Sequence, residues 1–463
     1  MGRTFHGAAA GLCPRAHCVR GQTERARPSQ QTAVMDLTMN ERRAQPQILV
    51  FATTRWQLAA RIAINFADRG CRVDALVPRG HPAECVGSVR EVHRFLPLTP
   101  LASLLAALEE MKPDLVVPCD DAAALLLHAL HRRCIEQPPP PVGLPALLER
   151  SLGNVDACVL AGSRSRFMEL ARASGVRTPP SANVRSLEEL REWTREHALP
   201  LVLKSDYSFG GQGVALARQW SEVETAWATL KRRPGVGESI MRALLERDSD
   251  RLRDWCRPPV DALTVQVAID GQPANRAVAC WEGEVLAGVS VEAMRTQHAT
   301  GPATVVRFVN HAEMEDTASR LVRQLGVSGL VGFDFMVEAA TGAAHLIEMN
   351  VRATPACHLP SSHGAALTAS LLARLRGERP PRLRPRFAAG VVVMFPGEFR
   401  TNPGSPYLQA AGHDVPWEHP ALVRDGLEPP WSERGWLAQV RRRWRAPRSS
   451  QPDPHSPVLA ESN

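Results

Sequence analysis

The chain has 463 residues, a formal net charge of +7, 44% hydrophobic and 22% charged residues. This length exceeds one ordinary core, so we expect two to four subdomains. No apolar run approaches the roughly 18 residues of a membrane helix, and the basic N-terminus lacks the hydrophobic region of a secretory signal. We therefore expect a cytoplasmic protein without a membrane partner. The ten cysteines include no Cys-x-x-Cys pair, which argues against a disulfide framework or a zinc site.

Both ends of the chain are basic and lack sustained apolar periodicity. We predict that residues 1–46 and 441–463 are disordered. The arginine-rich run at residues 441–445 includes Trp444 and follows Trp436, a combination that also fits contact with nucleic acid. We favour a solvated helix end that runs into a tail, and expect no nucleic-acid partner.

Residues 47–137 alternate between short apolar runs and segments of helical periodicity. Strands that alternate with helices predict an α/β domain with a parallel sheet and crossover helices. The predicted strands are residues 48–51, 72–77 and 114–118, and the predicted helices are residues 56–69, 101–111 and 122–132.

This first domain has no Gly-x-Gly-x-x-Gly turn, so we do not assign it a dinucleotide. Two loops follow its buried strands, at residues 52–55 and 119–121. Ligands of open α/β sheets bind at the carboxyl ends of the strands, and these two loops are therefore candidates for lining a substrate cleft.

The remaining chain divides at proline-rich segments. A stiff linker at residues 138–141 precedes a region of mixed α and β character, which we assign as a second domain at residues 138–375. Residues 376–440 form a C-terminal extension rich in proline and tryptophan, with one further predicted strand at residues 390–395. The sequence leaves open whether this extension caps the core or shapes a substrate pocket.

The first chemical signal is an apolar strand that ends in Lys204 and is followed by the glycines Gly210, Gly211 and Gly213. Glycines leave the backbone open to a ligand, and successive amide groups in such a loop bind phosphate oxygens. Lys204 would add a positive charge to the same phosphates. The structural alternative is a β-hairpin with a glycine-rich turn and an exposed lysine.

The second signal is a pair of strands, residues 332–337 and 345–352, joined by a turn at Gly342. Residues two apart share a strand face, so Glu348 and Asn350 point the same way. If the two strands pair through the turn, Asp334 comes beside Glu348. Two carboxylates and an amide oxygen make a hard-oxygen site suited to Mg²⁺. The alternative is a polar hairpin face with a salt bridge to Arg352.

Taken in order, these motifs resemble those of the ATP-grasp superfamily, which includes biotin carboxylase, carbamoyl phosphate synthetase and D-alanine–D-alanine ligase. The resemblance covers about residues 48–375. It implies a Rossmann-like N-terminal domain followed by an α+β ATP-grasp fold of two subdomains that hold ATP between them. The implied roles are phosphate contact for Lys204, a lid for Gly210, Gly211 and Gly213, metal binding for Asp334, Glu348 and Asn350, and substrate binding for Arg352.

Three further residues match the family less closely. Arg164 stands where a basic residue contacts phosphates, but Ser163 replaces the usual acid and Arg166 is a nearby rival. Gln266 stands where the family often has a glutamate beside the purine and ribose. Arg295 lies in a segment similar to the part of amino-acid ligases that positions phosphate, and is a candidate for γ-phosphate contact.

The resemblance implies an ATP- and Mg²⁺-dependent ligase, with Mn²⁺ as an alternative ion. It would convert a carboxylate to an acyl phosphate and join it to an amine, with release of ADP. The expected partners are ATP, a small carboxylate and an amine, together with a second copy of the chain in a homodimer. The alternatives are an ATP-grasp phosphotransferase or carboxylase-like enzyme and a regulatory ATP-binding protein without turnover.

Overall fold

The computed structural model describes residues 45–463 with gaps. Both ends that we predict to be disordered lie outside the described residues, apart from residues 45 and 46. The described residues are 45–137, 140–157, 164–205, 213–232, 235–246, 260–298, 301–359, 366–379, 390–429, 431 and 434. Among them, no helix has the length and apolar character needed to cross a bilayer.

The N-terminal region forms a four-stranded parallel sheet in the order β3-β2-β1-β4, as expected for an α/β domain. The strands are β1 (Gln47–Phe51), β2 (Arg72–Val77), β3 (Val89–Arg94) and β4 (Leu115–Pro118). The helices are α2 (Leu58–Ala67), η1 (Pro82–Cys85), α3 (Pro100–Met111), α4 (Asp121–Glu136) and α5 (Leu144–Leu152).

Alternate residues of β1 pack on opposite faces of this sheet, because side chains of a strand alternate. Ile48 and Val50 lie in one core with α2, and Leu49 and Phe51 lie in another with α3, α4 and α5. The order of the strands in the sheet changes direction between β1 and β4. Open α/β sheets bind ligands in the crevice at such a point, which here lies at the carboxyl ends of β1 and β4.

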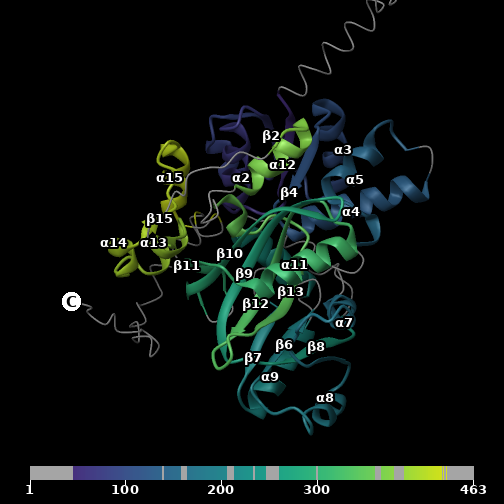
Figure 1. The fold of residues 1–463 in the computed structure, drawn as a ribbon, viewed down its shortest axis with the longest axis vertical. Coiled ribbons are helices and arrows are strands. Elements are labelled where there is room, and N and C mark those ends of the chain that lie inside the picture. The colour runs from purple at the N-terminus through teal and green to yellow at the C-terminus, as the bar shows by residue number, and fades with distance from the viewer. Residues whose placement is uncertain are drawn as a thin grey trace, which may run out of the picture. The chain divides into compact units, whose positions relative to one another are not determined.

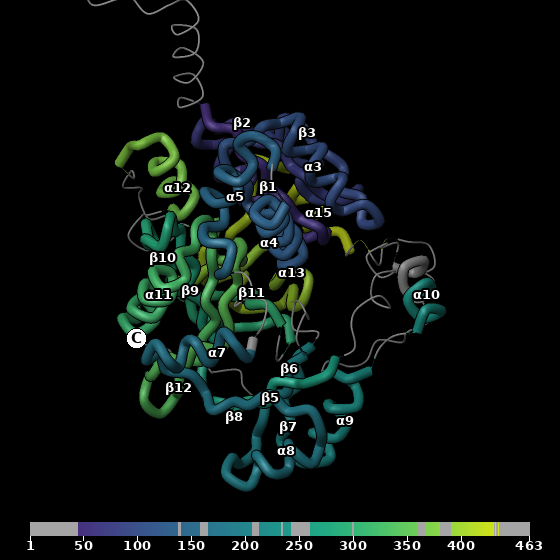
Figure 2. The backbone as a smooth tube through the Cα atoms, turned by 90° about the vertical axis from the view of Figure 1, so that its right-hand side faces the viewer, coloured from purple at the N-terminus to yellow at the C-terminus, as the bar shows by residue number. Residues whose placement is uncertain are grey.

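A smaller sheet of antiparallel strands follows, in the order β5-β8-β6-β7. Figure 2 shows its strands together with α8 and α9. Leu201, Leu203 and Val265 face α8 and α9 in one apolar core. The elements are β5 (Ser181–Val184), α8 (Leu187–Trp193), β6 (Leu201–Ser205), β7 (Val214–Ala217), α9 (Trp220–Lys231) and β8 (Leu263–Val267), with α7 (Arg164–Ala173) before them and α10 (Val236–Glu246) between α9 and β8.

The largest sheet has seven strands in the order β13-β12-β9-β10-β11-β14-β15 (Figure 1). Helix α11 covers one face, and α12 and η3 pack against the other face in a core shared with β1 and α2. The elements are β9 (Gly271–Trp281), β10 (Glu284–Thr296), β11 (Ala303–Val309), α11 (Ala312–Leu325), β12 (Gly329–Glu338), β13 (Ala344–Asn350), η3 (Pro355–His358) and α12 (Leu367–Arg376).

The C-terminal extension is built into this sheet through two strands, although the sequence predicts only one. Its Asp414 is buried between Arg61 of α2 and His358 of η3, with 2.5 Å between His358 Nε2 and Asp414 Oδ2. The extension therefore joins the N-terminal region to the large sheet. Its elements are β14 (Val391–Val393), α13 (Gly397–Thr401), α14 (Tyr407–Ala410), β15 (Gly412–His413) and α15 (Pro420–Leu427).

Candidate active site

Three polar residues that we predict to bind metal lie on two neighbouring strands of the large sheet. The antiparallel register sets Asp334 of β12 opposite Glu348 of β13, and Gly332 opposite Asn350. The predicted pairing of Asp334 with Glu348 is thus confirmed. On the other side of β12, Asp334 is opposite Asn275 of β9. Directly opposite residues share a sheet face, so all four polar side chains project from one face.

Two amide groups hold the Asp334 carboxylate. Asn275 Nδ2 donates to Asp334 Oδ1 at 2.7 Å, and Asn350 Nδ2 donates to Asp334 Oδ2 at 2.8 Å. This arrangement uses the NH₂ group of Asn350 and leaves its carbonyl oxygen as the atom suited to a metal. The donor set is then two carboxylates and one amide oxygen, which fits Mg²⁺.

The electrostatics of Asp334 also fit a cation. Burial raises the pKa of Asp334, and the negative charge of Glu348 raises it further, while the bonds from Asn275 and Asn350 and the charge of Arg352 act in the opposite direction. A divalent cation between Asp334 and Glu348 would relieve both the burial cost and the repulsion.

Gly332 allows the chain after β13 to return close to this face. A Cβ atom at position 332 would lie 2.2 Å from Thr354 Cγ2. Thr354 Oγ1 in turn donates to Asn275 Oδ1 at 3.4 Å. Position 332 therefore requires glycine for a steric reason, because any side chain there would displace Thr354 from Asn275.

Arg352 connects β12 and β13, which carry the predicted metal ligands, to the N-terminal sheet. Its Nε lies 2.8 Å from Asp121 Oδ1 in the first turn of α4, and its guanidinium carbon lies 5.8 Å from the centre of the Trp56 ring. Burial alone would lower the pKa of Arg352, but the charges of Asp121, Asp334 and Glu348 together raise it. Arg352 is therefore a permanent cation beside the two carboxylates.

Lys204 and Gln266 lie on the small sheet. Lys204 is opposite Thr264, and Gln266 is opposite Val202, so Lys204, Thr264 and Gln266 share the face turned away from the apolar core with α9. Lys204 is 6% exposed and Gln266 3% exposed, so the alternative of an exposed hairpin lysine does not hold. A polar, enclosed sheet face is suited to a ligand that carries both charge and hydrogen-bonding groups.

The other predicted residues are placed in part. Gly213 is buried just before β7, whereas Gly210 and Gly211 lie outside the described residues. Arg164 begins α7, but its side chain is outside the description. Arg295 lies on β10, with its Nε 3.3 Å from Oε1 of the buried Glu398 in the C-terminal extension.

Sequence reasoning did not identify Asn275, Asp121 or Glu398 as members of these contacts. Asn275 belongs to no motif, and only the pairing of β9 with β12 brings it to Asp334. The loop at residues 119–121 was a candidate for a substrate cleft, but its contact with Arg352 joins segments 231 positions apart. The pair of Arg295 and Glu398 likewise depends on tertiary structure.

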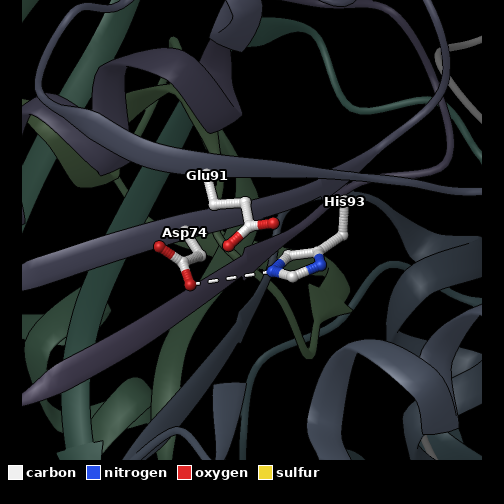
Figure 3. A group of neighbouring side chains, drawn as sticks. All are labelled: Asp74, Glu91 and His93. Atoms are coloured by element: carbon white, nitrogen blue, oxygen red, sulfur yellow. Dashed lines mark ion pairs between the residues drawn. The ribbon is translucent and has the colours of Figure 1, made fainter. Parts of the chain in front are cut away.

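A second polar cluster lies on the N-terminal sheet. Asp74, Glu91 and His93 bring three ligand atoms within 4.8 Å of one another (Figure 3). Asp74 is fully buried, and Arg90 donates to both of its oxygens, from Nε at 2.9 Å and from its terminal nitrogen. Because Arg90 neutralises Asp74, we assign this cluster a structural role in joining β2 to β3.

The family model for the carbamoyl-phosphate synthase L chain, ATP binding domain, matches residues 163–363. A formate-dependent phosphoribosylglycinamide formyltransferase from Bifidobacterium longum is 27% identical over 41% of this chain and 45% of its own length. The carbamoyl phosphate synthase large chain of Deinococcus radiodurans is 25% identical over 57% of this chain and 24% of its own length. This chain thus matches less than half the length of either relative.

The fold is similar to that of solved ATP- and ADP-bound enzymes. The structure of N5-carboxyaminoimidazole synthase from Aspergillus clavatus, in complex with ADP and an aminoimidazole ribonucleotide, has a TM-score of 0.54 at 15% identity. That likeness covers 74% of this chain and 81% of the Aspergillus chain. Residues 163–363 thus match a family of ATP-binding domains, and the fold of the chain is similar to that of these nucleotide-bound enzymes, in agreement with the resemblance to the ATP-grasp superfamily.

Proposed function

We propose that this chain is an ATP- and Mg²⁺-dependent ligase that activates a carboxylate as an acyl phosphate and joins it to an amine. The observation that carries the proposal is the set of Asp334, Glu348 and Asn350 on one sheet face, with Arg352 two residues farther along the chain. Mn²⁺ is the alternative ion for the same oxygen ligands.

The residues of the site have separate proposed roles. Asp334, Glu348 and the carbonyl oxygen of Asn350 would hold Mg²⁺, which neutralises charge on the β- and γ-phosphates. Lys204 would bind phosphate oxygens, and Gln266 would bind the adenosine part of ATP. Gly210, Gly211 and Gly213 would cover the phosphates. Arg164 and Arg295 are further candidates for phosphate contact.

The proposed reaction has two steps. A carboxylate oxygen of the substrate attacks the γ-phosphorus, the bond to the β-phosphate oxygen breaks, and ADP leaves with that electron pair. The amine nitrogen then attacks the acyl carbon, the C–O bond to phosphate breaks, and the nitrogen loses a proton. Arg352 would hold the carboxylate in the first step and stabilise the acyl oxygen in the second.

We also propose that the chain is divided into three segments between its two ends. We assign residues 47–137 to a Rossmann-like domain, residues 138–375 to the ATP-grasp domain and residues 376–440 to the C-terminal extension. The separate sheets of the first two segments support this division, although α5 (Leu144–Leu152) of the second segment packs in the apolar core of the first. We also propose a cytoplasmic location and a homodimer.

The test is nucleotide consumption by the purified protein with Mg²⁺ and pools of small carboxylates, amino acids and amines. We expect release of ADP, not AMP, only with particular substrates, and loss of that release in Glu348→Gln. Glu338→Gln, a matched change in the same hairpin, should retain activity. Tight binding of Mg·ATP without turnover in any pool would instead favour the regulatory ATP-binding protein.

A further inference from the structure

Two adjacent acids at the start of α4 have different surroundings. Asp120 is buried and accepts hydrogen bonds from the backbone and hydroxyl groups of Thr53 and Thr54 and from the backbone of Ala123. These bonds hold the loop after β1 against the loop after β4. Asp121 is 26% exposed on its side chain and points its Oδ1 at Arg352 Nε. Asp120 therefore has a structural role, while Asp121 faces the proposed substrate arginine.

The pair of Asp121 and Arg352 lies at the reversal of strand order in the N-terminal sheet. Asp121 follows the carboxyl end of β4, and the backbone of Ala353 donates to Pro118 O of the same strand at 3.0 Å. Trp56, from the loop after the neighbouring β1, lies over the guanidinium of Arg352. Open α/β sheets bind their ligands in such a crevice.

The carboxylates around Arg352 affect which charged groups of a substrate can bind beside it. Its charge interacts with three carboxylates, those of Asp121, Asp334 and Glu348. With Mg²⁺ bound to Asp334 and Glu348, Asp121 would remain as the acid beside Arg352. A substrate that brings only a carboxylate to Arg352 would meet the like charge of Asp121. A cationic group arriving with that carboxylate would pair with Asp121 and remove the repulsion.

We propose that Asp121 binds a primary ammonium group of a substrate, while Arg352 binds the carboxylate that is to be activated. This inference rests on the proposed ligase function and names a substrate class for it. The ammonium has two sources: it belongs to the carboxylate substrate itself, which is then an amino acid, or to the amine substrate, whose attacking nitrogen gives up one proton to solvent before it attacks the acyl phosphate. Both sources require the same anionic partner at position 121.

Binding without turnover gives the first test. Calorimetric titrations with a non-hydrolysable ATP analogue and Mg²⁺ compare glycine, alanine and glutamate with acetate, propionate and glutarate, and also include methylamine and putrescine. We expect an ammonium-bearing probe to bind at least about tenfold more weakly to Asp121→Asn than to the wild type, with partial recovery in Asp121→Glu. The exposed Glu109→Gln on α3 is the matched control. Melting temperatures near that of the wild type exclude misfolding as the cause.

Trapping with hydroxylamine distinguishes the two sources, because hydroxylamine is uncharged at neutral pH and converts an acyl phosphate to a hydroxamate. If the ammonium belongs to the carboxylate substrate, Asp121→Asn loses hydroxamate formation with amino acids but not with their des-amino analogues. If it belongs to the attacking amine, the variant forms hydroxamate normally but couples charged amines poorly.

Two results would overturn the ammonium assignment. An equal loss for all carboxylates, with or without an amino group, would mean that Asp121 only positions Arg352. Unchanged binding and coupling of every probe would remove any role in recognition. Failure of the wild type to release ADP with any pool is a different result, because it rejects the ligase function itself, whereas the calorimetric comparison still reports on Asp121.

Discussion

Asp334 and Glu348 lie directly opposite each other on β12 and β13, and the two amides that donate to Asp334 come from the strands on either side of it. Like charges at opposite positions of a sheet destabilise the folded state. Without metal, Glu348→Gln should therefore increase the free energy of unfolding by up to about 1 kcal/mol. Thermal denaturation in the presence of a chelator measures this. A less stable variant would mean that Glu348 has a structural role outweighing the repulsion.

Asn275 is predicted to orient Asp334 for metal binding. Removing its amide in Asn275→Ala frees one oxygen of Asp334 and should weaken metal affinity about tenfold or more. Titration of Mg²⁺ against nucleotide-dependent thermal stabilisation measures the effect. Asn183→Ala, an exposed position on β5, is the control and should leave the titration unchanged. An unshifted midpoint in Asn275→Ala would contradict the orienting role.

Glu398 and Arg295 should be coupled in stability. Glu398 is 1% exposed on its side chain and accepts a hydrogen bond of 2.5 Å from Thr304 Oγ1, so Arg295→Ala leaves a buried carboxylate without its cation. Each alanine substitution should lower the free energy of unfolding by about 2–4 kcal/mol, and the double variant by clearly less than the sum. Denaturant unfolding of all four proteins measures the coupling. Strict additivity would show that the pair contributes nothing as a pair.

The chain should lose stability in acid through buried neutral histidines. Burial, with help from nearby positive charges, lowers the pKa values of His81 and His128 to about 3 each. The unfolded chain takes up these protons below about pH 6.5, before the folded chain does, so stability falls as the pH falls from about 6.5 towards 3. Each histidine contributes up to about 1.4 kcal/mol per pH unit in that window.

His128→Leu tests this pH dependence, since His128 lies inside α4 and His81 also caps η1 through a bond from Ala83. The free energy of unfolding, measured by denaturant between pH 4 and pH 7, should depend less on pH in the variant. The exposed His298→Asn should retain the wild-type slope. Equal slopes in all three proteins would refute the assignment.

Much of the arrangement of the proposed metal site is predictable, because its residues lie close together in the sequence. Residues 332–352 contain both strands and the turn that joins them, so the pairing of Asp334 with Glu348 follows from local alternation. The contact of Asn275 with Asp334 is not predictable from the sequence, because a β-hairpin and a helix separate β9 from β12 along the chain. Asp121, the partner of Arg352, lies in the N-terminal region, and Glu398, the partner of Arg295, lies in the C-terminal extension. Both contacts depend on the packing of the whole fold.

The same distinction applies to the fold. Strands β1, β2 and β4 are buried apolar runs, and the sequence predicts all three. Strand β3 has no apolar signal in the sequence, because it is an edge strand whose residues are mostly exposed. Strand β15 has two residues and exists only because β14 offers a free edge beside it.

The central claim is that Asp334, Glu348 and Asn350 hold the metal of a bound Mg·ATP. Calorimetric titration of a non-hydrolysable ATP analogue, with and without Mg²⁺, tests it in the wild type, Glu348→Gln and the control Glu338→Gln. The account predicts binding that Mg²⁺ strengthens in the wild type and control, and a loss of that strengthening by about tenfold or more in Glu348→Gln. Equal dependence on Mg²⁺ in all three proteins would contradict it.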